Sequence, residues 1–189
     1  GFPAAKSIAD VVAAVRARAA TLPAGSFIVG LGWDEGKFAE QRLLTATDLD
    51  AATTDHPVVL TNTTGHYSAV NSAALRLANI TRETPDPPAG TIDRAADGTP
   101  TGVLKESAQA LVGDLIPPLT QEQEAEGIRA FSRELSAEGM TGFKDPGISA
   151  ETFETYHKLA AEGALPQRVF ALFSGGNTLE EAHELIAGR

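Results

Sequence analysis

A glutamate at the end of an apolar stretch is the residue of this sequence best placed to do chemistry. Glu106 follows Val103-Leu104 and begins a segment, 106–115, whose composition predicts a helix. Residues 91–104 before it predict a hairpin that turns at Asp97-Gly98, a favoured two-residue turn. A carboxylate fixed in this way suits a divalent metal ion or acid–base catalysis. The helix dipole alone also favours a glutamate at a helix start, so both interpretations stay open.

A histidine after a second predicted strand is the next candidate. His66 lies in the loop that follows the predicted strand 57–62, and loops after strands concentrate function in α/β folds. A neutral imidazole can bind a metal or hydrogen-bond to a carbonyl group. A loop histidine bonded to nearby backbone is the simpler alternative. Asn71, in Asn71-Ser72, is expected to cap the helix that follows.

Three further residues follow predicted strands. Trp33 is the chain's one tryptophan, and a lone tryptophan is more often part of a core than of a ligand site. Asp34, next to it, can simply cap a local turn. Asp145 ends a predicted strand before the turn expected at Pro146-Gly147, where an Asx turn explains an aspartate equally well. The remaining histidines, which we expect to be exposed to solvent, are His56, His157 and His183.

The elements that must position these residues alternate between helices and strands in the second half of the chain. Such alternation predicts parallel strands with crossover helices, in a barrel or an open sheet. We expect a barrel-type helix and strand in 1–44, an insertion subdomain with the hairpin in 45–119, and barrel-type helix/strand units in 120–189. The predicted fold class is therefore α/β, with partial (β/α) TIM-barrel units and a mixed α+β insertion subdomain.

Composition limits the partners and the compartment. The 189 residues carry a formal net charge of −10, which favours neither nucleic acid nor an anionic membrane as a partner. No apolar run approaches the ~20 residues of a membrane-spanning helix. The chain has no cysteine, which excludes disulfides and thiolate metal sites and fits a reducing compartment. We therefore expect a cytoplasmic protein that binds neither nucleic acid nor membrane.

Three motifs together resemble the YtcJ-like branch of the amidohydrolase superfamily, the amidohydrolase-3 family. They are Gly30-Leu31-Gly32-Trp33-Asp34, Gly65-His66 with Asn71-Ser72, and Gly102-Val103-Leu104-Lys105-Glu106-Ser107-Ala108. The resemblance covers nearly the whole chain and implies that Glu106 is a metal-bridging acid. Lys105 is a second candidate, because a carboxylated lysine is an alternative bridge in the superfamily. The residues that the resemblance places near the substrate are His66, Trp33, Asp34, Asn71 and Asp145.

The same resemblance implies an activity. Such enzymes hydrolyse C–N bonds of small amide-type substrates with a water activated by a divalent metal, for which we expect zinc. Their His-x-His motif would lie before Gly1, and their general-base aspartate beyond Arg189. We therefore expect an internal fragment that is inactive alone, binds zinc weakly if at all, and either associates through exposed strand edges or forms an open sheet. Thr64 and Ala69 depart from the family's usual Asp and Trp, which predicts a reshaped substrate pocket.

Two other functions stay open beside the hydrolase. In one, the His66 loop and the hairpin hold a small ligand without metal, in a non-catalytic binding module. In the other, the chain is a structural α/β module. A His-x-His motif in the flanking sequence favours the enzyme over the binding module. The structural module is tested by whether Glu106 and His66 face one shared cavity.

Overall fold

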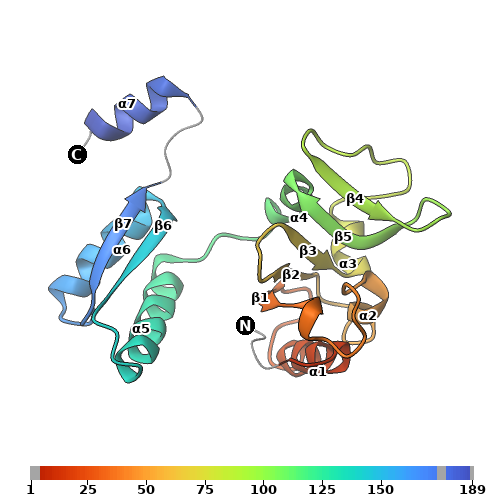
Figure 1. Ribbon diagram of the computed structural model, residues 1–189, viewed down its shortest axis with the longest axis horizontal. Coiled ribbons are helices and arrows are strands. Elements are labelled where there is room, and N and C mark those ends of the chain that lie inside the picture. The colour runs from red at the N-terminus through yellow and green to blue at the C-terminus, as the bar shows by residue number, and fades with distance from the viewer. Residues whose placement is uncertain (1–4, 174–177, 188–189) are drawn as a thin grey trace. The chain divides into compact units, whose positions relative to one another are not determined.

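The chain divides into two compact units, Gly1–Pro117 and Pro118–Arg189 (Figure 1). The computed structural model describes residues 5–173 and 178–187. Among the described helices, none is both long and apolar enough to cross a bilayer.

A five-stranded mixed sheet forms the centre of the first unit. Its strands are β1 (Ile28–Trp33), β2 (Val58–Asn62), β3 (Tyr67–Val70), β4 (Gly90–Arg94) and β5 (Pro100–Glu106), in the spatial order β1-β2-β3-β5-β4. β1 and β2 are parallel, and the other neighbours are antiparallel. The sheet therefore combines β1, from the expected segment 1–44, with β2 to β5 from the expected insertion subdomain 45–119. It also brings the start of β3 next to the end of β5.

Helices pack on both faces of this sheet, because its strands alternate apolar side chains between two cores. α1 (Ile8–Ala19) packs on one face, and α3 (Ser72–Leu77) and α4 (Ala110–Gly113) pack on the other. α2 (Ala46–Asp50) contributes Leu49 to the first core and Ala46 to the second. The first core joins Val11 and Val15 of α1 to Leu60 of β2. The second joins residues such as Ala74, Val112 and Leu104. Two short 3-10 helices complete the unit, η1 (Glu35–Lys37) and η2 (Ser107–Gln109).

The predicted hairpin is confirmed, but the predicted helix from Glu106 is not. β4 and β5 pair in antiparallel register, and Thr99 N donates to Asp97 Oδ1 (2.9 Å) in the turn between them. β5 continues through Glu106, since its backbone N–H donates to the carbonyl of His66 (2.9 Å). Cross-strand pairing therefore overrides the local helix signal, and only η2 and the four-residue α4 follow.

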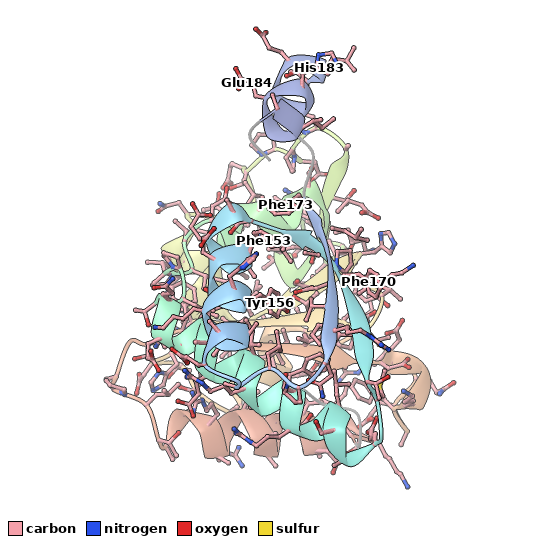
Figure 2. The ribbon with its side chains drawn as sticks, turned by 90° about the vertical axis from the view of Figure 1, so that its left-hand side faces the viewer. Phe153, Tyr156, Phe170, Phe173, His183 and Glu184 are labelled. Atoms are coloured by element: carbon pink, nitrogen blue, oxygen red, sulfur yellow. The ribbon has the colours of Figure 1, made fainter. Side chains whose placement is uncertain are left out.

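The second unit contains a parallel two-stranded sheet. Its elements are α5 (Gln121–Ala137), β6 (Gly142–Ile148), α6 (Ala150–Ala161), β7 (Arg168–Phe173) and α7 (Leu179–Ala187). β6 and β7 are parallel and joined through α6, as the alternation predicts. Phe173 packs on Phe153 of α6, with ring centroids 5.0 Å apart, whereas Phe170 is 60% exposed (Figure 2). The turn predicted at Pro146-Gly147 is wrong: both residues lie inside β6, where the register with β7 shifts.

Candidate functional site

His66 and Glu106, 40 residues apart in sequence, meet at one edge of the first unit's sheet. His66 Nδ1 lies 3.1 Å from Oε1 and 3.2 Å from Oε2 of Glu106. The pairing follows from the sheet, because His66 immediately precedes β3 and Glu106 ends the adjacent β5. The two side chains are 69% and 57% exposed. The two leading candidates therefore form an imidazole–carboxylate pair that is open to solvent.

Glu106 has an unusual backbone conformation. Its φ of +50° and ψ of −127° are rarely adopted by residues other than glycine and cost about 1–3 kcal/mol. Two contacts hold the chain just beyond it. Ser107 Oγ donates to the carbonyl of Pro88 (2.5 Å). Gly90 approaches so closely that a Cβ there would lie 2.4 Å from the backbone nitrogen of Ala108. Strain at this position is the kind of outlier found where a side chain must be aimed.

The loop before His66 is held by the side chains of Thr64 and Gln109, of which Gln109 was missed in the sequence. Thr64 Oγ1 accepts from the His66 N–H (3.3 Å) and donates to Asn62 Oδ1 (2.9 Å). Gln109 Nε2 donates to the Gly65 carbonyl (3.0 Å), and Gln109 Oε1 accepts from Ser68 Oγ (2.6 Å). The sequence signal that could have pointed to Gln109 was its position three residues after Glu106.

Lys105, the second candidate for a metal bridge, is paired with an aspartate. Its ammonium forms an ion pair with Asp93 of the neighbouring strand, with Nζ 2.8 Å from Oδ1. Adjacent residues of a strand point to opposite faces of a sheet.

Trp33 and Asp34 both have structural partners. The Trp33 side chain is fully buried; its indole N–H donates to the Leu60 carbonyl (2.8 Å), and its ring stacks on Phe38. Asp34 caps η1, where its carboxylate accepts from the Gly36 N–H (3.0 Å). The local turn expected at Asp34 is thus present.

Glu35, in η1 directly after Asp34, is a further carboxylate that was missed in the sequence. Glu35 accepts hydrogen bonds from the Tyr67 hydroxyl and from Asn62 Nδ2, the latter at 2.9 Å. Burial, together with the hydrogen bond to Glu35, raises the pKa of Tyr67 well above its usual range. Tyr67, the residue after His66, is therefore held to η1 with its hydroxyl protonated.

Asn71 is completely buried and uses its amide inside the protein. Its Oδ1 accepts from the N–H groups of Val58 and Ala74, both at 3.0 Å. Its Nδ2 donates to the carbonyls of Thr53 (3.1 Å) and His56 (2.9 Å). The predicted helix cap is confirmed, and the same side chain also ties α3 to the start of β2.

Asp145 belongs to the second unit. Its Oδ2 accepts a hydrogen bond from the Tyr156 hydroxyl (2.6 Å) across β6 and α6. Burial and this carboxylate raise the pKa of Tyr156 above its usual range.

Two expectations about individual side chains are wrong. Ala69 does not shape a surface pocket, because it is fully buried in the sheet between Leu60 and Val103. His56 is only 6% exposed, since it lies at the start of β2 with Nδ1 2.9 Å from the Ser26 carbonyl. The other two histidines are exposed as expected: His157, and His183 on α7 (Figure 2).

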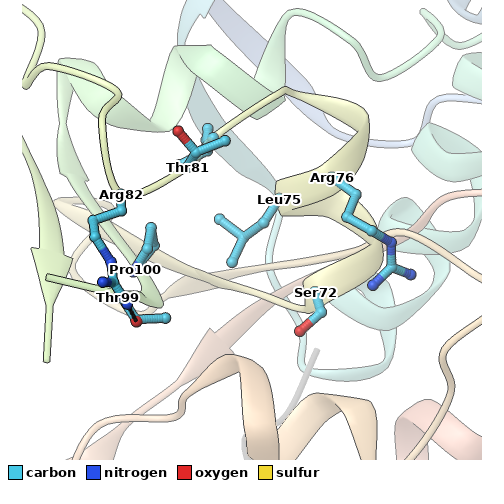
Figure 3. Close-up of a pocket in the computed structure, with 8 residues that line it drawn as sticks. Ser72, Leu75, Arg76, Thr81, Arg82, Thr99 and Pro100 are labelled. Atoms are coloured by element: carbon cyan, nitrogen blue, oxygen red, sulfur yellow. Dashed lines mark hydrogen bonds between the residues drawn. The ribbon is translucent and has the colours of Figure 1, made fainter. Parts of the chain in front are cut away.

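A cavity of about 350 Å³ lies elsewhere in the first unit (Figure 3). Leu75 of α3 and Ile80 contribute apolar side chains to its lining, and Arg76 and Arg82 contribute cationic ones. Arg82 is already paired, because its guanidinium contacts Thr99 Oγ1 (3.1 Å) and Asp97 (3.4 Å).

The imidazole–carboxylate pair does not by itself make a metal site. Within residues 5–173 and 178–187, no group of three or more His, Cys, Asp or Glu side chains is arranged to hold a metal ion. Catalytic zinc sites use three protein ligands and an open position. The donor set at His66 and Glu106 is chemically suitable but too small for such a site.

The family model described as "Amidohydrolase family" matches residues 2–188. The chain belongs to this family. It is 36% identical over 168 residues to amidohydrolase YtcJ of Bacillus subtilis, a match that covers 86% of the chain and 32% of that protein. It is 28% identical over 177 residues to an N-substituted formamide deformylase of Arthrobacter pascens, covering 92% of the chain and 33% of that protein. The chain thus spans about a third of the length of these relatives.

Two solved structures of metal-dependent hydrolases have a similar fold. The one from Pyrococcus horikoshii superposes with a TM-score of 0.60 at 24% identity, over 97% of the chain and 33% of that protein. The one from Pyrococcus furiosus gives 0.56 at 26% identity, over 95% of the chain and 34% of that protein. The mixed α/β fold of the chain is therefore similar to about a third of each of these two hydrolases.

Proposed function

We propose that this chain is a segment of a metal-dependent amidohydrolase that hydrolyses C–N bonds of a small amide-type substrate. The observation that carries the proposal is the juxtaposition of His66 and Glu106 at the end of β5. Family membership supports it, as does the similarity to a formamide deformylase. Because the chain spans about a third of its relatives, the activity is proposed for the longer protein.

Glu106 is the ligand that this segment contributes to a zinc site. Its exposed carboxylate has free lone pairs beyond those that face the imidazole, and carboxylate oxygens bind zinc. His66 orients the carboxylate through Nδ1, as hydrogen-bonded partners of ligating carboxylates do. When bound, zinc polarises a carbonyl and lowers the pKa of its water. Since the described residues supply only this pair, no step of the hydrolysis is assigned to them.

The missing ligands and the general-base aspartate belong to other parts of the longer protein. On this proposal the β6–α6–β7 unit is part of a (β/α) barrel, for which its parallel register is support. The 189-residue chain alone then binds zinc weakly and hydrolyses no amide. Isothermal titration of the chain with zinc chloride tests this. A shallow isotherm without saturation is expected, whereas tight one-to-one uptake together with hydrolysis of an amide contradicts the proposal.

A second experiment tests Glu106 directly in the longer protein. Glu106→Gln keeps the size of the side chain but removes the charge that a zinc ligand needs. We expect its zinc content, measured by plasma mass spectrometry after dialysis, to fall well below that of the unmodified protein. Glu126→Gln, at an exposed glutamate of α5, is the matched control and retains zinc. Equal zinc content in both variants refutes the role of Glu106 as a zinc ligand.

A further inference from the structure

We propose that Gln109 is the positioning residue that holds His66 beside Glu106, an inference that rests on the proposed function. Gln109 lies three residues after Glu106, in η2, and its side chain reaches back to the loop that carries His66. It is bonded on both sides of the histidine, to the carbonyl of Gly65 and the hydroxyl of Ser68. No other described side chain links the segment after Glu106 to both flanks of His66.

The loop at His66 depends on such a link because it has little packing of its own. Gly65 has a φ of +78°, and a Cβ placed there would meet nothing within 4 Å. The His66 side chain is 69% exposed. An exposed ion pair contributes little by itself, since water screens it and side-chain entropy opposes it. Hydrogen bonds to the loop backbone must therefore supply the orientation.

Gln109 completes a closed set of contacts around the pair. The Glu106 N–H donates to the His66 carbonyl at 2.9 Å, which fixes the two backbones. Gln109 Nε2 then fixes the peptide that enters His66, at 3.0 Å from the Gly65 carbonyl. Gln109 is itself only partly exposed, because η2 packs it beside Ala108, which is fully buried. The backbone at His66 is therefore held at the position from which the imidazole faces the Glu106 carboxylate.

Nuclear magnetic resonance on the 189-residue chain tests the geometry without metal. The measured quantity is the nuclear Overhauser effect between the imidazole Hε1 of His66 and the γ-methylene of Glu106. Gln109→Leu keeps the size but removes both hydrogen bonds, and we expect the effect to fall several-fold. Ser68→Ala removes one bond and leaves the Gly65 link, so the effect is retained. Gln121→Leu, at an exposed glutamine of α5, is the control for an equivalent change elsewhere.

Gln109→Glu separates positioning from folding if the leucine variant does not fold. A carboxylate still accepts from Ser68 but cannot donate to the Gly65 carbonyl, so the Overhauser effect is lost although the partly exposed position tolerates the change. An unchanged effect in either folded Gln109 variant overturns the proposal.

Zinc affinity of the longer protein distinguishes this inference from the proposed function. Loss of a direct partner of a metal ligand typically lowers affinity by about 10–100-fold. Because Gln109 acts on Glu106 only through His66, we expect Gln109→Leu to lower zinc affinity by about tenfold, the lower end of that range. If Glu106→Gln leaves zinc affinity unchanged, the proposed function fails, but the resonance experiment still decides the role of Gln109. If Glu106→Gln abolishes binding while Gln109→Leu leaves both affinity and Overhauser effect unchanged, only the positioning role fails.

Discussion

Replacement of Asn71 by alanine tests whether this buried amide serves the fold. The side chain is fully buried and takes part in four hydrogen bonds. Asn71→Ala leaves two N–H groups and two carbonyls without these partners. At about 1 kcal/mol for each lost hydrogen bond, the free energy of unfolding of the first unit falls by about 4 kcal/mol. That is a large part of the roughly 5–15 kcal/mol of a typical domain.

The assay uses the chain's one tryptophan, Trp33, which is buried in the first unit. Its fluorescence during urea titration reports unfolding of that unit alone. With a slope of about 2 kcal/mol per molar urea, the midpoint shifts down by about 2 M. Asn79→Gly, at an exposed residue with a φ of +52°, is the control and changes stability by less than about 1 kcal/mol. A loss below about 1 kcal/mol for Asn71→Ala refutes the account of its hydrogen bonds.

Three other predictions are tested by the same fluorescence. Gly102→Ala lowers the free energy of unfolding by more than about 2 kcal/mol, because Gly102 has a φ of +90° and a Cβ would lie 2.4 Å from the carbonyl oxygen of Val70. The control is Gly25→Ala, which has a φ of +80° but open space around the Cβ and costs about 1 kcal/mol. Equal losses in the two variants contradict the steric argument. Asp48→Asn makes stability depend less on pH in the acid range. Hydrogen bonds from Arg42 lower the pKa of Asp48, so its contribution to the free energy of unfolding is present above about pH 4 and lost below it. A variant that loses stability on acidification as steeply as the unmodified chain counts against this. Tyr67→Phe makes stability depend less on pH in the alkaline range. Burial raises the pKa of Tyr67, so its contribution to the free energy of unfolding is complete below about pH 10 and lost as the pH rises further. A variant that loses stability with rising pH as steeply as the unmodified chain refutes it.

The sequence contained the strongest signals for the site but not the contacts that build it. The Asp97-Gly98 turn and the apolar residues before Glu106 were sufficient to predict the hairpin. They did not predict that β5 would extend to Glu106, because that depends on pairing with β3. β3 itself has four residues, too few for a periodic signal. The meeting of Glu106 with His66 is therefore a consequence of sheet register.

Polar residues were harder to interpret from sequence than apolar ones. Asn71 was correctly expected to cap a helix, yet its bonds to Thr53 and His56 depend on segments distant in the chain. Gln109 carries no local pattern, and its partners are 41 and 44 residues away. Long-range hydrogen bonds of this kind follow from tertiary packing, which neither periodicity nor capping rules describe.

Anomalous diffraction from crystals of the longer protein grown with zinc tests the central claim most directly. The account predicts a zinc peak about 2.0–2.2 Å from a carboxylate oxygen of Glu106, with His66 still hydrogen-bonded to that carboxylate. An occupied zinc site to which Glu106 contributes no oxygen contradicts it.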